Sequence, residues 1–327
     1  MSSRNPFVAD RKARTRFEDG EAAFGEALRA AAAPYIATDA DSVIPRAAAQ
    51  GLVERFGLGS TDQLMVHLVA LAAERATPPL SGFHVGAVGL EAETGALVLG
   101  WNLEFPGAPI AMTIHAEGFV ATRAYARGNR LARIAISEAH PCAHCRQYLC
   151  EFDWRDEIEL IDPLGHRLML ADLYPWPFDP AYLGGCGAVP GRTSAHPVAH
   201  GWTVDGAVRD ALLEAGARSH TPYSQAPAAA VIEMRDGTLL SGVAIESVAF
   251  NPTMTPIQAA LIALVAHGYD YEDIAQVHVG ADPSGPVDHG AATRQLMGAL
   301  APDAGVSILA WSRGAAGNKE GGHGHPQ

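Results

Sequence analysis

Two short clusters between residues 113 and 145 constrain this chain more than any other feature. The first is Thr113-Ile114-His115-Ala116-Glu117, and the second is Pro141-Cys142-Ala143-His144-Cys145. An imidazole and a C-x-x-C pair form a ligand set that Zn²⁺ prefers. Three protein ligands leave the fourth position to water, which is the arrangement of a catalytic zinc site. The sequence therefore predicts a zinc site formed by His115, Cys142 and Cys145.

Glu117 follows the histidine by two residues, which is close enough to move protons on a water bound to the metal. We expect hydroxide to be the nucleophile and Glu117 to be the proton shuttle rather than a fourth ligand. Pro141 precedes a predicted helix that begins at the cysteine pair, and the N-terminal end of a helix favours thiolates.

The alternative is a closed, structural zinc site in which Cys150 or His144 is the fourth ligand. Structural sites do use C-x-x-C pairs, but they usually bring a second pair, and they have no use for Glu117. We expect His144, which lies inside the pair, to be at the surface or behind the ligands.

The net charge and the cysteine content narrow the possible functions. A chain of 327 residues with a net charge of -13 is a poor partner for nucleic acid and suits a small neutral substrate. No apolar run is long enough for a membrane span, and the N-terminus lacks the apolar core of a secretory signal. Four cysteines, three of them within residues 142–150, indicate a reducing cytoplasm rather than a disulfide framework.

The pattern of apolar residues predicts an α/β protein. Strand-like runs at residues 84–91, 96–103 and 131–137 alternate with helices at 112–127 and 143–152. We expect five segments along the chain. They are a helical N-terminal segment at 1–60, a domain with both clusters at 61–183, a Gly/Pro-rich linker at 184–200, a second domain at 201–312 and a flexible tail at 313–327.

The second half repeats the first without its chemistry. Residues 95–104 are echoed by 237–246, and 114–117 by 257–260, at offsets of 142 and 143. Two copies of one unit explain this, although chance similarity among α/β segments is an alternative. In this alignment Gln258 replaces the metal histidine and Ala260 the glutamate, and residues 187–327 contain no cysteine.

Further motifs support a family resemblance. They are Phe83-His84-Val85-Gly86-Ala87, Asn102-Leu103-Glu104-Phe105, the Arg146-Gln147 pair after the second cluster, Ser219-His220-Thr221-Pro222-Tyr223-Ser224 and Ala249-Phe250-Asn251-Pro252-Thr253. With the zinc clusters, they make the chain resemble the cytidine deaminases, specifically the long homodimeric type with a catalytic domain followed by a degenerate copy.

The resemblance implies two repeated three-layer α/β/α domains with mixed sheets after a small helical segment. It implies zinc-dependent hydrolytic deamination of cytidine and deoxycytidine in pyrimidine salvage, by a cytoplasmic homodimer. Attack would occur at C4 of the cytosine ring, with Glu117 passing a proton to N3 and then to the leaving amine.

The resemblance also assigns substrate contacts. Asn102 and Glu104 would hold the ribose hydroxyls, and the backbone around Ala116 would bind the base carbonyl. Phe83 would face the pyrimidine ring, although plain core packing is an alternative for an aromatic residue. Phe178 would cap the pocket of the partner subunit.

Three departures from the family pattern concern Gly118, His140 and Trp101. His140 lies beside the expected path of the departing ammonia, and Trp101 precedes the ribose-binding Asn102. They motivate a second hypothesis, in which the chemistry is the same and the substrate is a modified nucleoside or another amino-heterocycle. A non-enzymatic alternative is a regulatory module pinned by zinc.

Overall fold

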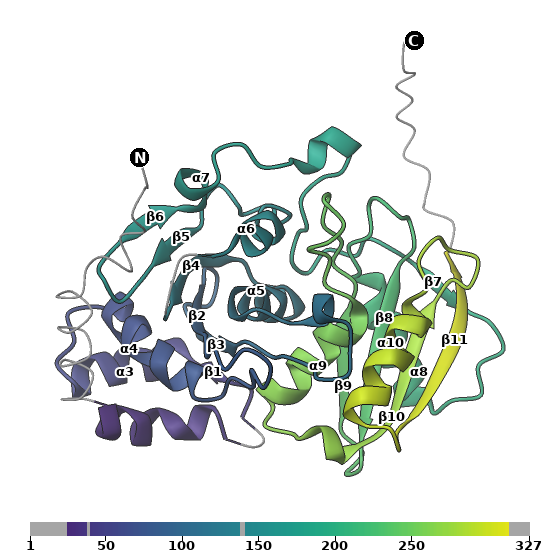
Figure 1. Ribbon diagram of the computed structural model, residues 1–327, viewed down its shortest axis with the longest axis horizontal. Helices are drawn as coiled ribbons and strands as arrows, with labels where there is room; N and C mark the ends of the chain where they lie inside the picture. The colour runs from purple at the N-terminus through teal and green to yellow at the C-terminus, as the bar shows by residue number, and fades with distance from the viewer. Residues whose placement is uncertain (1–24, 38–39, 138–140, 314–327) are drawn as a thin grey trace, which may run out of the picture.

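The computed structural model describes residues 25–37, 40–137 and 141–313, and it contains two β-sheets covered by helices (Figure 1). The elements of the first half are β1 (Val43–Ile44), α3 (Arg46–Arg55), α4 (Thr61–Ala73), β2 (Gly86–Glu91), β3 (Leu97–Trp101), α5 (Ala116–Ala126), β4 (Leu131–Ile136), α6 (Ala143–Leu149), β5 (Glu159–Ile161), β6 (Arg167–Met169) and α7 (Leu170–Leu173). Those of the second half are β7 (Pro197–Ala199), α8 (Gly206–Ala217), β8 (Ala228–Met234), β9 (Leu239–Val243), α9 (Pro256–Ala266), β10 (Ile274–Ala281), α10 (His289–Leu300) and β11 (Gly305–Arg313).

The two sheets share one topology, which confirms the predicted duplication. The first has the order β1-β3-β2-β4-β5-β6, and the second has the order β7-β11-β10-β8-β9. Within them, β3-β2-β4-β5 corresponds to β9-β8-β10-β11. In both sets the last two strands are parallel and the other neighbours are antiparallel. Both sheets are therefore mixed, as expected.

The structure corrects the alignment of the two copies by three residues. Leu103 bridges Ile114 just before α5, and Ile245 bridges Met254 just before α9. The N-cap residues that follow these bridges are His115 and Thr255. The strands keep the offset of 142, but the helices are offset by 140, because the loop before α9 is shorter. Thr255 and Ile257 therefore correspond to His115 and Glu117, and the predicted match with Gln258 and Ala260 is wrong. The conclusion that the second copy lacks the site is unchanged.

Helices cover both faces of each sheet. In the first half α4 packs on one face and α5 on the other. The N-cap Ser60 of α4 accepts a hydrogen bond from the amide of Gln63, and the Gln63 side chain accepts from the amide of Gly59. In the second half Gly216 of α8 lies against Trp311, and Gly290 of α10 lies against Ile308. Trp311 and Ile308 are three residues apart on β11, so these helices lie on opposite faces.

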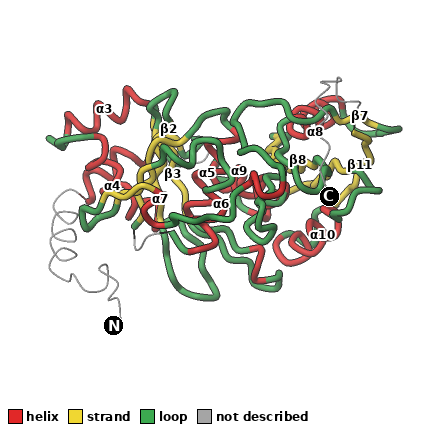
Figure 2. The backbone as a smooth tube through the Cα atoms, turned by 90° about the horizontal axis from the view of Figure 1, so that it is seen from above, coloured by secondary structure: helices red, strands yellow, loops and turns green. Residues whose placement is uncertain are grey.

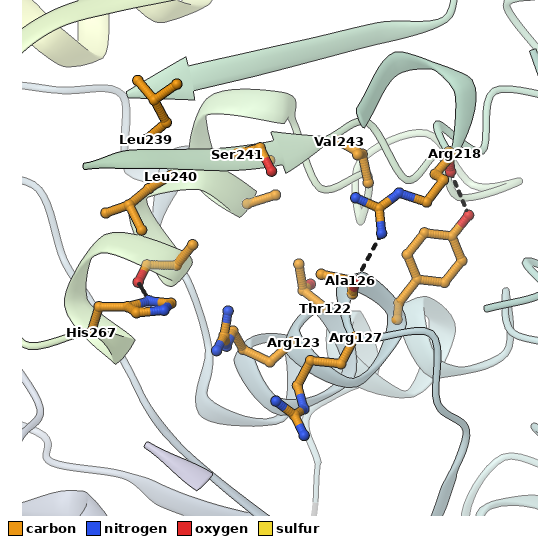
Figure 3. Close-up of a pocket in the computed structure, with 14 residues that line it drawn as sticks. Thr122, Arg123, Ala126, Arg127, Arg218, Leu239, Leu240, Ser241, Val243 and His267 are labelled. Carbon is orange, nitrogen blue, oxygen red and sulfur yellow. Dashed lines mark hydrogen bonds between the residues drawn. The ribbon is translucent and has the colours of Figure 1, made fainter. Parts of the chain in front are cut away.

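The two halves meet through α5 and α9, which pack against each other between the sheets (Figures 1 and 2). A cavity of about 200 Å³ lies along this contact, lined by parts of α5, β9 and α9 (Figure 3). The arginines beside it are held by protein partners. Arg127 pairs with Glu91 at 2.6 Å, and Arg218 donates to the carbonyl of Ala126 at 3.1 Å. None of the residues predicted for the zinc or substrate site lines this cavity.

Two of the predicted segments each contain a short strand. The segment 1–60 is not purely helical, because β1 pairs antiparallel with the edge strand β3. The linker 184–200 is not wholly without regular structure, because β7 pairs antiparallel with β11. Both strands are short pieces that cover sheet edges, and two or three residues give too weak a pattern to predict. The expected tail lies outside the described residues apart from Arg313, which ends β11.

No helix in the described ranges combines the length and the hydropathy that crossing a bilayer requires.

Gly118 and Gly242, which lie against α9 and the residues just before it, differ in the space that a side chain would find there. A Cβ at Gly118 in α5 would lie 3.6 Å from Met254, an ordinary contact, whereas a Cβ at Gly242 in β9 would lie 2.1 Å from the amide nitrogen of Ala260. Gly118→Ala should raise the free energy of unfolding by about 0.5–1 kcal/mol, because alanine is the better helix former. Gly242→Ala should lower it by about 3 kcal/mol, because backbone atoms cannot make room. Denaturant unfolding of both variants measures these changes; a loss of stability in Gly118→Ala would contradict the packing described here.

Candidate active site

The N-terminal ends of α5 and α6 lie side by side and bring the predicted metal ligands together. His115 is the N-cap of α5, and Cys142 is the N-cap of α6. The Nδ1 atom of His115 lies 3.4 Å from the sulfur of Cys142 and 3.2 Å from that of Cys145, and the two sulfurs are 3.7 Å apart. Tetrahedral zinc with ordinary bond lengths separates two sulfurs by roughly 3.8 Å. The donor set and the spacing of these three residues therefore fit Zn²⁺.

The protonation of the two thiols is coupled. The hydrogen bond between the two sulfurs lowers the pKa of Cys142 to about 3, with a further contribution from His115. The same shared proton, together with burial, raises the pKa of Cys145. One thiolate therefore forms readily, and the second needs a cation to replace the shared proton. Binding of a metal here should release that proton.

Glu117 is buried one turn inside α5, with 5% of its surface exposed. Its carboxyl group hydrogen-bonds with Cys145, so it lies directly beside the ligand cluster. Burial raises the pKa of Glu117 above the usual range of a carboxyl group. A carboxyl group with a raised pKa holds a proton more readily than an exposed one, which suits a group that transfers protons.

The two candidates for a fourth protein ligand are placed very differently. Cys150 is the C-cap of α6 and Cys142 its N-cap, so the helix length separates them by about 12 Å. A site closed by Cys150 is therefore wrong. His144 does lie near the cluster, because one of its ring nitrogens is within 4.8 Å of donor atoms of His115 and Cys145. It is exposed, and its ring centre is 5.5 Å from that of His115.

Phe83 and Asn102 are neighbours on the loop before β2 and the end of β3. The Asn102 side chain accepts from the amide of Val85 and donates to the carbonyl of Phe83, both at 2.9 Å. It fixes the loop and keeps further hydrogen-bonding capacity, since an amide has two donors and two acceptor lone pairs. The Phe83 side chain is 55% exposed, so core packing, the alternative for this residue, is wrong.

Glu104 is bound by the same stretch of chain. Its carboxylate accepts from the amides of Leu80 and Ser81 at 2.8 and 2.9 Å and from the Ser81 hydroxyl at 2.5 Å. Burial works in the opposite direction, but these hydrogen bonds and the nearby His115 lower the pKa of Glu104. Ser81 was not among the predicted site residues. A lone serine before a glycine turn gives no sequence signal of this contact.

The second copy retains the same carboxylate clamp. Glu246, at the position of Glu104, accepts from the amides of Tyr223 and Ser224 at 3.0 and 3.1 Å. A contact present in a copy without metal ligands serves the fold of the loop. The clamp at Glu104 is thus partly structural, and any ligand at Glu104 has to share the carboxylate with it.

The remaining predicted residues fall in three situations. Ala116 is fully buried and opens α5, so its amide is one of the first-turn N–H groups that have no acceptor within the helix. Phe178 is 41% exposed and stacks on Tyr182 with ring centres 5.6 Å apart. Its backbone is held by Gln147 of α6 through two hydrogen bonds. His140 lies outside the described residues.

The other two departures from the family pattern, Trp101 and Gly118, pack against other parts of the protein. Trp101 is 1% exposed, and its ring packs against Phe119 at 4.9 Å and under the guanidinium of Arg75. Gly118 faces Met254 and Tyr148. Both positions belong to the core and to the contact between the halves, so neither supports an altered substrate.

Comparisons with known proteins agree with this geometry. Two stretches, residues 59–158 and 191–294, match the family description "Cytidine and deoxycytidylate deaminase zinc-binding region". A cytidine deaminase of Vibrio vulnificus is 33% identical over 300 residues, which cover 90% of this chain and 99% of that protein. One from Cronobacter sakazakii is 35% identical over 287 residues, covering 87% of this chain and 95% of that protein.

The chain belongs to the cytidine deaminase family. The chain is also similar to a solved structure of a cytidine deaminase from Mycobacterium tuberculosis, with 30% sequence identity and a TM-score of 0.31. The match covers 35% of this chain and 94% of the solved one. The two cytidine deaminase matches correspond to the two sheets, so the degenerate half keeps the family fold. The relatives from Vibrio and Cronobacter align along both halves, as expected for the long type with two domains.

The ligand set predicts the zinc content of the purified protein. The protein as purified should contain about one zinc ion per chain, because only the first copy has the ligands. Cys142→Ala should lose most of this zinc. Cys186→Ala, at an exposed cysteine outside the cluster, should retain it. Metal analysis of the three proteins tests the assignment, and equal zinc in both variants would contradict it.

Proposed function

We propose that this chain catalyses the hydrolytic deamination of cytidine and deoxycytidine to uridine and deoxyuridine, with release of ammonia. The observation that carries the proposal is the triangle of His115, Cys142 and Cys145 with the buried carboxyl group of Glu117 against it. Membership of the cytidine deaminase family supports the same conclusion.

In the proposed mechanism His115, Cys142 and Cys145 would hold zinc, which would lower the pKa of a water molecule and so supply a nucleophile at neutral pH. Water adds at C4 of the pyrimidine ring, and the amino group leaves as ammonia. Glu117 handles the protons: it takes one from the attacking water, gives it to N3 of the ring, and later serves the departing amine. The raised pKa of Glu117 suits a group that must be protonated and deprotonated in each turnover.

Four predicted residues supply the proposed contacts with the substrate. We propose that the exposed ring of Phe83 stacks on the pyrimidine and that the first-turn amide of Ala116 binds the base carbonyl. Asn102 and Glu104 hydrogen-bond the ribose hydroxyls with the capacity that their loop contacts leave. A carboxylate at the sugar also repels a 5′-phosphate, so a nucleoside is preferred over a nucleotide.

We also propose that the enzyme acts as a homodimer in pyrimidine salvage in the cytoplasm. Trp176, Phe178, Tyr182 and Leu183 are exposed on one segment, with exposed fractions between 41% and 90%. Apolar side chains gathered in this way are typical of a contact surface. In the dimer, Phe178 of one chain caps the pocket of the other. Light scattering on the protein as it elutes from a size-exclusion column should give the molar mass of two chains.

The activity itself is tested by mixing purified protein with cytidine and following the loss of cytosine absorbance. The same assay should be run with deoxycytidine, cytidine 5′-monophosphate and modified nucleosides. Modified nucleosides are included because His140 departs from the family pattern beside the expected path of the departing ammonia. Inert cytidine beside rapid turnover of a modified nucleoside would overturn the proposed substrate and keep the chemistry. Zinc held by four protein ligands, including His144, in an inactive protein would instead favour the regulatory module.

Glu117→Gln should lower kcat by about 10²–10⁴-fold, the usual contribution of a positioned acid–base group. Zinc content should stay unchanged, because Glu117 is not a ligand in this mechanism. Glu157→Gln, the same change on a side chain that is 70% exposed, should leave kcat unchanged. Near-normal turnover in Glu117→Gln would rule out its role as the shuttle.

Phe83→Ala should raise KM for cytidine by about 5- to 100-fold, because stacking on a base contributes about 1–3 kcal/mol. Val198→Ala, which shortens another exposed apolar side chain, should leave KM unchanged. Initial rates over a range of cytidine concentrations measure both. An unaltered KM in Phe83→Ala would place the ring outside the pocket.

A further inference from the structure

The degenerate domain, residues 201–312, contacts both chain segments that carry the predicted zinc ligands. The most buried of these contacts is at Glu151, which follows directly after the C-cap of α6 and is 0% exposed. No feature of the sequence distinguished this acid. Its position matters because α6 carries both cysteine ligands at its other end.

Among the described residues, the three hydrogen bonds of the Glu151 side chain all come from the degenerate domain. One carboxylate oxygen accepts from Nε2 of His220 at 2.8 Å and from the hydroxyl of Tyr223 at 2.6 Å. The other accepts from the amide of Val248 at 2.8 Å. Burial raises the pKa of Tyr223, which keeps its hydroxyl protonated as the donor. A buried carboxylate with three donors in this geometry holds its position tightly.

The loop that contains Val248 also reaches the other end of α6. A backbone group of Asn251 hydrogen-bonds with the ring of His144, which lies between the two cysteines. Phe250, beside Asn251, adopts a left-handed conformation with a φ of 59°, and its ring packs edge-on against Tyr223. The loop is thus tied to the same residues that bind Glu151, and it holds α6 near both of its ends.

The degenerate domain holds the start of α5 as well. Nε2 of Gln258 donates to the carbonyl of Met112, three residues before His115, at 2.9 Å. The Gln258 side chain is oriented by Thr255, whose amide and hydroxyl both donate to its oxygen. Met254 packs on Gly118, the residue after Glu117. The segment that carries His115 and the helix that carries Cys142 and Cys145 are therefore both held by the degenerate domain.

We propose that Glu151 is a positioning residue for the zinc site, through which the degenerate domain sets the separation of His115 from the cysteine pair. The inference rests on the proposed function only in that it takes this cluster to be the zinc site. It gives the second copy, which has no metal ligands, a mechanical role in the chemistry of the first.

Two tyrosines provide a matched test. Tyr223→Phe removes the hydroxyl that donates to Glu151. Tyr125→Phe removes a hydroxyl that donates to the carbonyl of Arg218 at 2.7 Å, a contact that also joins the two halves but lies at the far end of α5 from the zinc cluster. Each change deletes one hydrogen bond between the halves without removing the ring. Glu151→Gln completes the set, because it keeps the shape and removes the charge.

The readouts are zinc affinity by competition with a chelator, the visible absorption of the cobalt-substituted protein, thermal stability, and kcat and KM for cytidine. We expect Glu151→Gln to weaken zinc binding by about 10- to 100-fold, as loss of a residue that orients metal ligands does. Tyr223→Phe should weaken it several-fold. Both should shift the cobalt spectrum and lower kcat with little change in KM, and Tyr125→Phe should alter only the stability.

Equal zinc affinities and identical cobalt spectra in all three variants would overturn the proposal and leave Glu151 a purely structural contact. Should Glu151→Gln fail to fold, Tyr223→Phe against Tyr125→Phe still decides the question. The metal measurements do not need a substrate. A protein inactive on cytidine would therefore refute the proposed function while the comparison of zinc affinities remains valid.

Discussion

The chemistry of this protein depends on the meeting of two helix N-termini. His115 and Cys142 occupy equivalent N-cap positions on α5 and α6, and each has the extended backbone of a residue that precedes a helix. The two helices pack against each other, and their first turns meet at the sulfur and imidazole groups. The partial positive charge of each first turn favours thiolates and other anions there. A cation is then needed to balance the negative charge of the thiolates. The buried carboxyl group of Glu117 lies beside this cluster.

The sequence predicted the local parts of this arrangement well. The spacing of His115, Glu117 and the C-x-x-C pair was enough to predict a ligand set before any fold was known, since the preferred ligand types follow from chemistry. The hydrogen bond at the N-cap Ser60 and the turn at Gly128, which has a φ of 79°, are likewise local, because they involve residues at most a few positions apart. Local rules suffice for such features, and the alternation of strands and helices was enough for the fold class.

The contacts between distant residues were not predictable from the sequence. The match of 114–117 with 257–260 was a coincidence of small apolar residues, and only the bridges at Leu103 and Ile245 reveal the shorter loop. Trp101 directly precedes Asn102 in the sequence, but its ring packs in the core, because successive side chains of an extended chain point to opposite sides. Glu151 is one acid among several in its stretch, and its partners lie about 70 to 100 residues away.

The packing of α5 against α9 has a consequence for how such a protein can change. Because both copies belong to one polypeptide, each meets the other at a high effective concentration, and the contact needs little intrinsic affinity to persist. Mutations that would dissolve an assembly of separate subunits are tolerated when the link is covalent. Covalent linkage therefore allowed one copy to lose its catalytic residues while it remained packed against the other copy.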